Sequence, residues 1–188
     1  MIERRIGSGS TGTVYRARGP APHTTVAIKV LAAELAQDSG VVQMFDEEAN
    51  VGLQIKHPNI VQTLSVGREG GQPYIVFEFV HGLTLASQIQ KGRLPEDQCL
   101  YLMRQLAQAL RHLRQKGVVH QDIKPENILI EMNGNAKLTD LGFARVQHGK
   151  IDWSGFTVGT ANYMSPEQAD GTKDVDGRAD LYALGATI

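Results

Sequence analysis

The spacing of apolar residues changes near residue 80, and this change limits what the chain can fold into. Before it, the runs TVYRAR and TVAIKV are rich in β-branched residues and are separated by GPAPHT, which contains glycine and proline. Such runs are typical of short strands joined by a turn. After it, Leu102, Met103, Leu106, Leu110 and Leu113 recur with the period of a helix that buries one face. The sequence therefore predicts two units of different kinds.

The first unit also contains a helix. Two further apolar runs, IVQTLSVG and YIVFEF, flank the turn REGGQP, and between the two pairs of runs Val41, Phe45, Ala49 and Leu53 recur at helical spacing. This pattern predicts a small α+β unit with strands around one helix. No low-complexity linker or internal repeat separates the two units, so we place the boundary in a short connection at residues 79–82. Residues 1–80 then form the first domain and residues 81–188 the second.

Composition and charge narrow the classes of function. With 41% hydrophobic and 21% charged residues, the chain has enough apolar content for a core. A formal net charge of -1 gives no whole-chain attraction to nucleic acid or to an anionic membrane. No segment approaches the roughly 20 apolar residues of a membrane span. We therefore expect a cytoplasmic globular protein without a nucleic-acid partner; a membrane anchor elsewhere in the full-length protein stays open.

The glycine-rich stretch GSGSTGTV lies between two strand-like segments. Gly7, Gly9 and Gly12 allow sharp turns and close approach to a ligand, and they leave backbone amides able to face phosphate. The dinucleotide-binding fingerprint opens a helix, whereas Thr13 and Val14 here continue as a strand. The stretch indicates either a phosphate-binding loop or a plain glycine-rich hairpin.

Lys29 ends the apolar run VAIK downstream of these glycines. A lysine on an open strand face is often only solvated. Here, however, the predicted helix that follows carries Glu47 and Glu48, and Glu48 lies three residues after Phe45, near the apolar face. Glu48 is therefore placed to point inward and neutralise a lysine that binds phosphates, whereas we expect Glu47 to be solvated.

The segment VVHQDIKPENILI places several chemically useful side chains on a short polar step between two apolar ends. Asp122 is a candidate base, Lys124 is a cation for a transferring phosphate, and Asn127 offers a carbonyl oxygen that suits Mg²⁺. Asp140, in LTDLGFAR, adds a second oxygen ligand before a glycine that permits a sharp turn. Phosphoryl transfer relies on positioning and charge neutralisation, so this set predicts that reaction.

The ordered motifs resemble the protein kinase family. They are GSGSTGTV, VAIK, a helix glutamate, HQDIKPEN, DLG and SPE, and they run from the first residues to the last. The resemblance implies an α+β, bilobal fold with a small, mostly antiparallel β N-lobe that has one main helix, and a mostly helical C-lobe that is incomplete here. It further implies a serine/threonine protein kinase of the bacterial branch, with ATP and Mg²⁺, or Mn²⁺, as cofactors.

The resemblance also implies how ATP and the metal are bound. Lys29, paired with Glu48, would hold the α- and β-phosphates, and Asn127 and Asp140 would hold the metal ion. The other residues implied to bind ATP are Gly7, Ser8, Gly9, Gly12, Val14, Ala27, Phe77, Glu78, Val80 and Leu129.

The resemblance assigns the transfer step to three residues. Asp122 would accept or orient the proton of the acceptor hydroxyl, Lys124 would reach the γ-phosphate, and Thr160 would bridge the two. The lysine in HQDIKPEN and the threonine in VGTANYMSPEQ imply serine or threonine acceptors on proteins. In DGRADLY, Asp180 resembles the helix acid that braces the catalytic loop, and Asp176 is a candidate helix N-cap.

Gln121 departs from the family pattern, which has arginine at this position to receive the phosphate of the activation loop. Glutamine is neutral and offers no bidentate fork to a phosphate. We therefore expect chemistry to be kept and the dependence on loop phosphorylation to be weak. Thr157 is the first candidate for self-phosphorylation and Ser154 the second, although both are equally readable as solvated hydroxyls; Arg145 is a substitute phosphate receptor.

Two alternatives stay open at this point. The first is a pseudokinase that uses the same fold as a binding module, but Lys29, Glu48, Asp122, Asn127 and Asp140 are all present. The second is a small-molecule kinase of the same fold, which phosphorylation of protein but not of choline or aminoglycosides would exclude. Because the last apolar helix pattern has no capping signal, we also expect these 188 residues to be a truncated piece that is unstable or inactive by itself.

Overall fold

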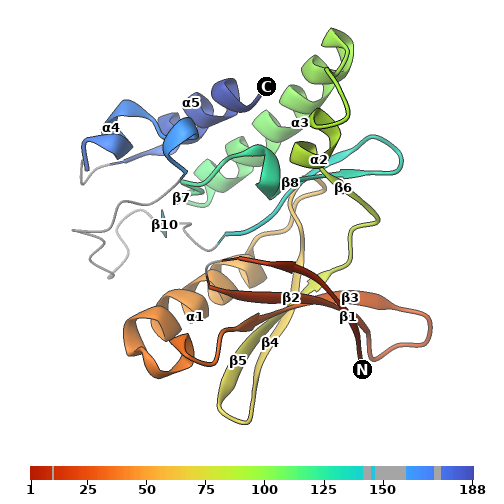
Figure 1. The fold of residues 1–188 in the computed structure, drawn as a ribbon. Helices are drawn as coiled ribbons and strands as arrows, with labels where there is room; N and C mark the ends of the chain where they lie inside the picture. Colours follow the sequence, from red (N-terminus) through yellow and green to blue (C-terminus); the bar gives the residue numbers. More distant parts are fainter. Residues whose placement is uncertain (10, 142–144, 147–159, 172–174) are drawn as a thin grey trace. The chain divides into compact units, whose positions relative to one another are not determined.

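The structure is a computed structural model that describes residues 1–9, 11–141, 145–146, 160–171 and 175–188. The chain forms two compact units (Figure 1). The first contains Met1–Lys56 and Val61–Val80, and the second contains His57–Ile60 and His81–Ile188. We describe each unit by itself.

The first unit is built on a five-stranded antiparallel sheet with the order β1-β2-β3-β5-β4. Its strands are β1 (Ile2–Ser8), β2 (Gly12–Arg18), β3 (Thr25–Leu31), β4 (Thr63–Glu69) and β5 (Gln72–Glu78). The runs TVYRAR, TVAIKV and YIVFEF fall in or largely in β2, β3 and β5. The strand predictions for these runs are therefore confirmed.

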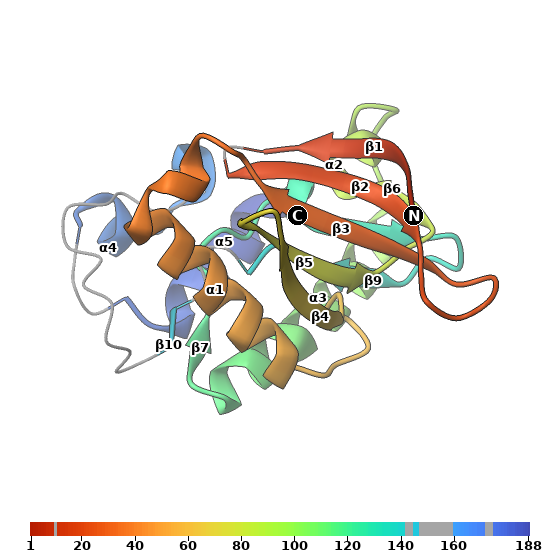
Figure 2. The same ribbon diagram turned by 90° about the horizontal axis from the view of Figure 1, so that it is seen from below.

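One main helix, α1 (Ser39–Gln54), accompanies the sheet and follows the short 3-10 turn η1 (Leu35–Gln37). Asp38 begins α1, because its carboxylate accepts hydrogen bonds from the backbone N–H groups of Gly40 and Val41. The helix packs against β4 and β5 (Figure 2). The core of this unit consists of Leu31, Phe45, Ala49 and Ile75.

Leu53 does not belong to that core, although the predicted apolar stripe included it: 37% of its surface is exposed. Residues four apart on a helix are offset by about 40°, because 3.6 residues make one turn. Three such steps turn Leu53 about 120° away from Val41 around the helix axis. The apolar stripe therefore leaves the core before α1 ends.

The second unit contains a long helix and several short elements. Its elements up to residue 127 are β6 (Gly82–Thr84), α2 (Leu85–Ile89), α3 (Glu96–Gln115), β7 (Val118–Val119) and the 3-10 turn η2 (Pro125–Asn127). We call residues 118–127 the catalytic segment, after the candidate base Asp122. The remaining elements are β8 (Ile128–Glu131), β9 (Ala136–Leu138), β10 (Arg145–Val146), the 3-10 turn η3 (Ala161–Tyr163), α4 (Pro166–Ala169) and α5 (Gly177–Thr187). Strands β6, β8 and β9 form one small antiparallel sheet, and β7 pairs with β10.

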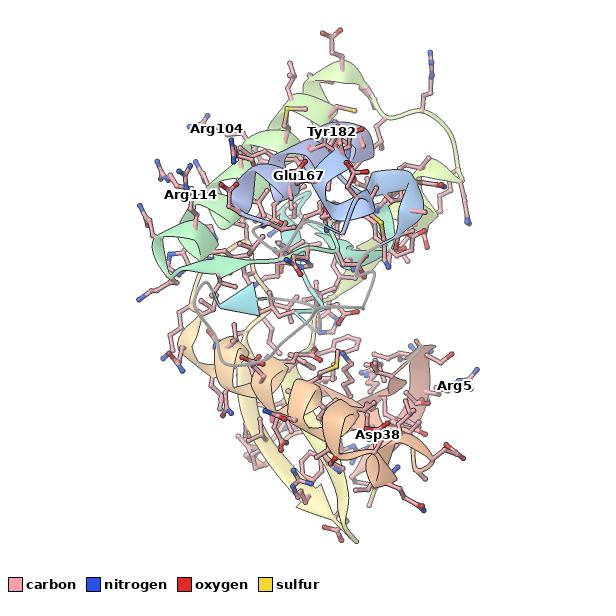
Figure 3. All side chains as sticks on the ribbon, turned by 90° about the vertical axis from the view of Figure 1, so that its left-hand side faces the viewer. Arg5, Asp38, Arg104, Arg114, Glu167 and Tyr182 are labelled. Carbon is pink, nitrogen blue, oxygen red and sulfur yellow. The ribbon has the colours of Figure 1, made fainter. Side chains whose placement is uncertain are left out.

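Helices α3 and α5 pack against each other in this unit. The predicted stripe of α3 is buried at its four leucines, while Arg104 and Arg114 lie on its exposed side (Figure 3). Helix α5 begins at the predicted N-cap, since the Asp176 carboxylate accepts a hydrogen bond from the Arg178 N–H at 2.8 Å. With an antiparallel β unit that carries one main helix and a second unit dominated by helices, the predicted fold class is confirmed.

A four-residue segment after α1, His57–Ile60, is anchored in the second unit. The Asn59 side-chain amide donates to Gln105 Oε1 at 2.7 Å and to the Ala136 carbonyl at 2.8 Å. The Asn59 carbonyl accepts from the Leu138 N–H at 2.8 Å. One buried asparagine thus joins this segment to α3 and β9. Within the described residues, no helix combines the length and the apolar character that crossing a membrane requires.

Candidate active site

Lys29 and Glu48 form a buried ion pair in the first unit. The Lys29 Nζ lies 2.9 Å from Glu48 Oε1 and 2.8 Å from Oε2, and the two residues are 9% and 5% exposed. Lys29 sits on β3, in the middle of the sheet, and Glu48 sits on the inward face of α1. The two-point contact holds the ammonium group at a defined position with little freedom to move.

The sheet places three predicted ATP-binding residues on the same face as Lys29. Val14 is the cross-strand partner of Lys29, and Ala27 is the partner of Phe77. Direct partners in an antiparallel pair share a face, and so do residues two apart on one strand. Val14, Ala27, Lys29 and Phe77 therefore form one surface of the sheet.

The predicted glycines differ in their surroundings. A Cβ at Gly12 would overlap the carbonyl oxygen of Val30, so pairing of β2 with β3 requires a glycine there. A Cβ at Gly7 or Gly9 would meet nothing within 4 Å. Gly12 is thus explained by strand packing, whereas Gly7 and Ser8, at the end of β1, and Gly9, directly after it, keep an approachable backbone.

At the end of β5, Glu78 is anchored to the residue that precedes β4. The Glu78 N–H donates to the Gln62 carbonyl at 2.9 Å, and the Glu78 carboxylate accepts from the Gln62 N–H at 2.9 Å. Phe79 follows with the Arg16 guanidinium 5.3 Å from its ring centroid. These contacts fix the chain direction up to Val80, the last residue of this unit.

In the second unit, Asp180 on α5 holds the backbone that leads into Asp122. Its two carboxylate oxygens accept from the N–H groups of His120 at 2.9 Å and Gln121 at 2.8 Å. Gln121 has a φ of 68°, in the left-handed region that glutamine rarely adopts. Burial raises the pKa of the Asp180 carboxyl, while His120 and the two backbone N–H groups oppose that rise. The sequence analysis expected Asp180 to hold this loop, whereas the left-handed backbone of Gln121 is seen only in the structure.

Asp122 itself is 3% exposed and is oriented from three sides. The Asn127 side-chain amide donates to the Asp122 carbonyl and to its Oδ2, both at 2.9 Å. The Thr160 hydroxyl donates to Oδ1 at 3.1 Å, and it accepts from the Lys124 Nζ at 2.8 Å. The same Lys124 Nζ lies 2.8 Å from Asp122 Oδ2. A carboxylate, an ammonium group and a hydroxyl are thereby joined into one closed network.

His120 lies under this network and is fully buried. Its Nδ1 accepts from the Asp122 N–H at 3.3 Å, so its Nε2 carries the proton and donates to the Thr139 carbonyl at 3.2 Å. The Thr139 N–H in turn donates to the Asn127 carbonyl at 2.9 Å. These bonds hold the end of β9, and with it the next residue, Asp140, against the catalytic segment.

The donor set at this place suits a hard divalent cation. Because the Asn127 amide nitrogen donates to two Asp122 oxygens, the side chain's orientation is defined and its Oδ1 is turned the other way. Asp140 contributes a carboxylate on a residue with a φ of 64°. A neutral oxygen and a carboxylate are ligands that Mg²⁺ accepts, with its remaining positions taken by water and phosphate oxygens. Leu129, the remaining predicted residue of this unit, lies on β8 opposite Thr84 of β6.

The sequence of the chain was compared with models of known protein families. All 188 residues of the chain match the family model described as "Protein kinase domain". The chain belongs to the protein kinase family. Several similar bacterial proteins are named as serine/threonine-protein kinases. One of them, Serine/threonine-protein kinase PrkC of Bacillus subtilis, is 39% identical over 190 residues, which cover 100% of this chain and 29% of PrkC.

Two other similar proteins are also named as serine/threonine-protein kinases. Serine/threonine-protein kinase pkn2 of Myxococcus xanthus is 37% identical over 191 residues, which cover 98% of this chain and 23% of pkn2. Serine/threonine-protein kinase PknB of Mycobacterium leprae is 37% identical over 190 residues, which cover 97% of this chain and 30% of PknB. The chain spans less than a third of the length of these three relatives.

Some residues of the kinase domain were missed by sequence reasoning. Asn59, Gln105 and Gln168 are buried amides whose hydrogen bonds join segments far apart in the chain. In the sequence they look like ordinary polar residues, and only burial distinguishes them. Thr157 and Ser154 lie outside the described residues, and so does the side chain of Arg145, although its backbone belongs to β10.

Proposed function

We propose that this protein is a serine/threonine protein kinase that transfers the γ-phosphate of ATP to serine or threonine hydroxyls of proteins, with Mg²⁺ as the metal ion. The observation that carries the proposal is the closed network in which Lys124 and Thr160 hold the two oxygens of the Asp122 carboxylate. The serine/threonine kinases named above support it, because their similarity extends over nearly the whole chain.

Each half of the proposed mechanism uses contacts within one unit. In the first unit, Lys29 presents a fixed ammonium to the α- and β-phosphates, with Glu48 preventing it from swinging away. The glycines at positions 7, 9 and 12, with Ser8, cover the phosphates, while Val14, Ala27, Phe77 and the 78–80 backbone bind the adenine ring. In the second unit, Leu129 is a further proposed ATP-binding residue. When bound, the metal ion neutralises phosphate charge, and Asn127 and Asp140 are its proposed ligands.

In the second unit, Asp122 takes up or orients the proton of the acceptor hydroxyl. The Thr160 hydroxyl and the Asn127 amide hold the carboxylate in one orientation, which favours attack along a single direction. Lys124 stabilises the negative charge of the phosphoryl group in transfer. The Lys124 Nζ already has two oxygen partners, so the side chain is extended toward the site rather than into solvent.

Gln121 makes the activity only weakly dependent on phosphorylation of the activation loop. The backbone conformation of Gln121 is fixed by Asp180 rather than by a bound phosphate. The side chain is neutral, so a phosphate in the loop would not form with it the bidentate ion pair that an arginine offers. Thr157 is the proposed site of self-phosphorylation. Phosphorylation there is a result of the kinase activity and is not required to turn that activity on.

Intact-mass spectrometry of the full-length protein incubated with Mg²⁺ and ATP tests this function, beside an Asp122→Asn variant. Added phosphate masses are expected in the first and none in the second, because an amide is too weak a base for the acceptor proton. Thr157→Ala is expected to turn over a protein substrate at the wild-type rate after phosphatase treatment. No phosphate transfer by a wild-type protein that still binds ATP would favour the binding-module alternative, and a large loss in Thr157→Ala would refute the role given to Gln121.

A further inference from the structure

A single side chain, Gln168, connects helix α4 to the catalytic segment. It is only 8% exposed, and both ends of its amide are used. Its Oε1 accepts from the N–H and the hydroxyl of Ser165, each at 3.2 Å, and its Nε2 donates to the carbonyl of Gln121 at 3.1 Å. One amide therefore joins the start of α4 to the residue before Asp122.

The bond to Gln121 acts on Asp122 through the backbone. The carbonyl of Gln121 and the N–H of Asp122 belong to one planar peptide group, so fixing the oxygen fixes the orientation of that N–H. The Asp122 N–H donates to His120 Nδ1, and the Gln121 N–H donates to Asp180. Gln121 is thus held on both sides of its left-handed Cα, by Asp180 on the N–H and by Gln168 on the carbonyl.

The chain between Thr160 and Gln168 is attached to the catalytic segment at both ends. At one end, the Thr160 hydroxyl bridges Lys124 and Asp122. At the other end, Gln168 reaches the Gln121 carbonyl. The contact made by Gln168 carries no net charge and needs no phosphate. It therefore offers a link between the segment 160–168 and the catalytic base that persists whatever the modification of the chain before Thr160.

We propose that Gln168 is a positioning residue that holds the segment 160–168 and the Gln121–Asp122 peptide in register for transfer to a protein acceptor. This inference rests on the proposed function, since it concerns the same reaction. An amide is suited to the task because one end donates and the other accepts. A carboxylate would keep the contacts with Ser165 and lose the donor toward Gln121.

The test is Gln168→Glu in the full-length protein, with Gln108→Glu on the exposed face of α3 as the matched control. Glutamate is nearly isosteric and is a favoured partner for a serine at a helix start, so the contacts with Ser165 should be kept. The loss of the donor is expected to lower kcat for casein phosphorylation about tenfold, since a buried hydrogen bond of roughly 1.4 kcal/mol corresponds to that factor. The KM for ATP should not change, and Gln108→Glu should match the wild type.

A pH series provides a readout that a purely structural role would not move. A protonated glutamic acid regains an O–H donor for the Gln121 carbonyl, and burial raises the pKa of such a carboxyl. The ratio of the variant's kcat to that of the wild type should therefore rise toward one as the pH falls from about 8 to about 6. A ratio that stays constant across this range, or a kcat equal to that of the wild type at pH 8, would overturn the proposal.

Amide hydrogen exchange separates failure of this inference from failure of the proposed function. In Gln168→Glu at pH 8, exchange in the peptides covering residues 118–124 and 160–168 should be faster than in the wild type, and α1 should be unaffected. Unchanged exchange would overturn the link even in an active enzyme. A wild-type protein that transfers no phosphate would instead remove the proposed function, and would remove with it the role of Gln168 in the reaction, whatever the exchange shows.

Discussion

The two units hold their functional side chains by different physical means. In the first unit, Lys29 is positioned by a buried ion pair with Glu48. In the second unit, Asp122 also has an ammonium partner, Lys124, but hydrogen bonds from an amide and a hydroxyl orient its oxygens, and its backbone is held in turn by Asp180, His120 and Gln168. The first unit positions its lysine mainly by an ion pair, whereas the second unit adds several directional hydrogen bonds to its ion pair.

Under the proposed function, this difference follows from what each side chain would have to do. A phosphate-binding lysine must keep its charge in a buried place, and a buried charge is tolerated only when it is paired. A base must instead present its oxygens in one direction, and hydrogen bonds with defined geometry achieve this better than a charge alone. The comparison predicts that a single mutation in the Lys29–Glu48 ion pair causes a large loss of stability and of ATP binding. A single mutation in the network around Asp122 should cause a smaller loss.

The largest effect is expected for Lys29→Met. Removing the lysine takes the ammonium partner away from the buried Glu48 carboxylate, which should lower the free energy of unfolding by about 3–5 kcal/mol. The double variant Lys29→Met/Glu48→Leu should recover most of this loss, because a buried ion pair is often replaced by apolar residues without penalty. Neither variant should bind ATP phosphates with wild-type affinity.

Chemical denaturation and an ATP-binding measurement on the three proteins check this expectation. A single variant that unfolds within about 1 kcal/mol of the wild type would show that the Lys29–Glu48 ion pair contributes little to the stability of the first unit. A double variant as unstable as the single one would point to lost packing and not to an unpaired charge.

A smaller loss is expected for Asp180→Asn. Asparagine has one acceptor oxygen where aspartate has two, so either the His120 or the Gln121 N–H stays unsatisfied in a buried place, at about 1–3 kcal/mol. The matched control is Asp176→Asn at the N-cap of the same helix, where asparagine caps as well as aspartate and the change should stay below about 0.5 kcal/mol. Denaturant midpoints of both variants give the comparison, and equal losses would contradict the special role of Asp180.

The smallest effect concerns the segment His57–Ile60 and its response to pH. The His57 Nδ1 accepts from the Asn59 N–H, and the ring lies 5.2 Å from that of His112. Burial lowers the pKa of His57, and the neighbouring His112, Arg111 and Lys137 lower it further. Between the lowered value and the ordinary value of 6.5 the unfolded chain binds more protons than the folded one, so stability is lost as the pH falls through this window.

His57→Asn keeps an acceptor for the Asn59 N–H and removes the titrating ring. The melting temperature should therefore decline less steeply in this variant than in the wild type as the pH is lowered below about 7. His23→Asn, at an exposed turn of the first unit, is the control and should leave the slope unchanged. An identical slope in His57→Asn would show that another group accounts for any loss of stability in acid.

Local patterns in the sequence contain much of the fold and of the site. The β-branched runs and the leucine spacing of α3 predict strands and a helix because burial of one face imposes a fixed period on the residues. The order of the motifs brings out Lys29, Asp122, Asn127, Asp140 and Thr160 as candidates, because a few residue types supply the charges and oxygens that phosphoryl transfer needs. Each of these inferences uses residues close together in the chain or a residue type that is chemically distinctive.

Only the tertiary structure decides how these residues are held. Gln168 and Asn59 are unremarkable amides in the sequence, and their importance comes from partners 47 and 46 positions away. The left-handed backbone of Gln121 likewise depends on Asp180, 59 positions away, and no local signal predicts it. Residue type and spacing are properties of the chain by itself. Burial and long-range hydrogen bonds exist only once the chain has folded, so the sequence determined which groups are candidates for the chemistry and the structure decided what keeps them in place.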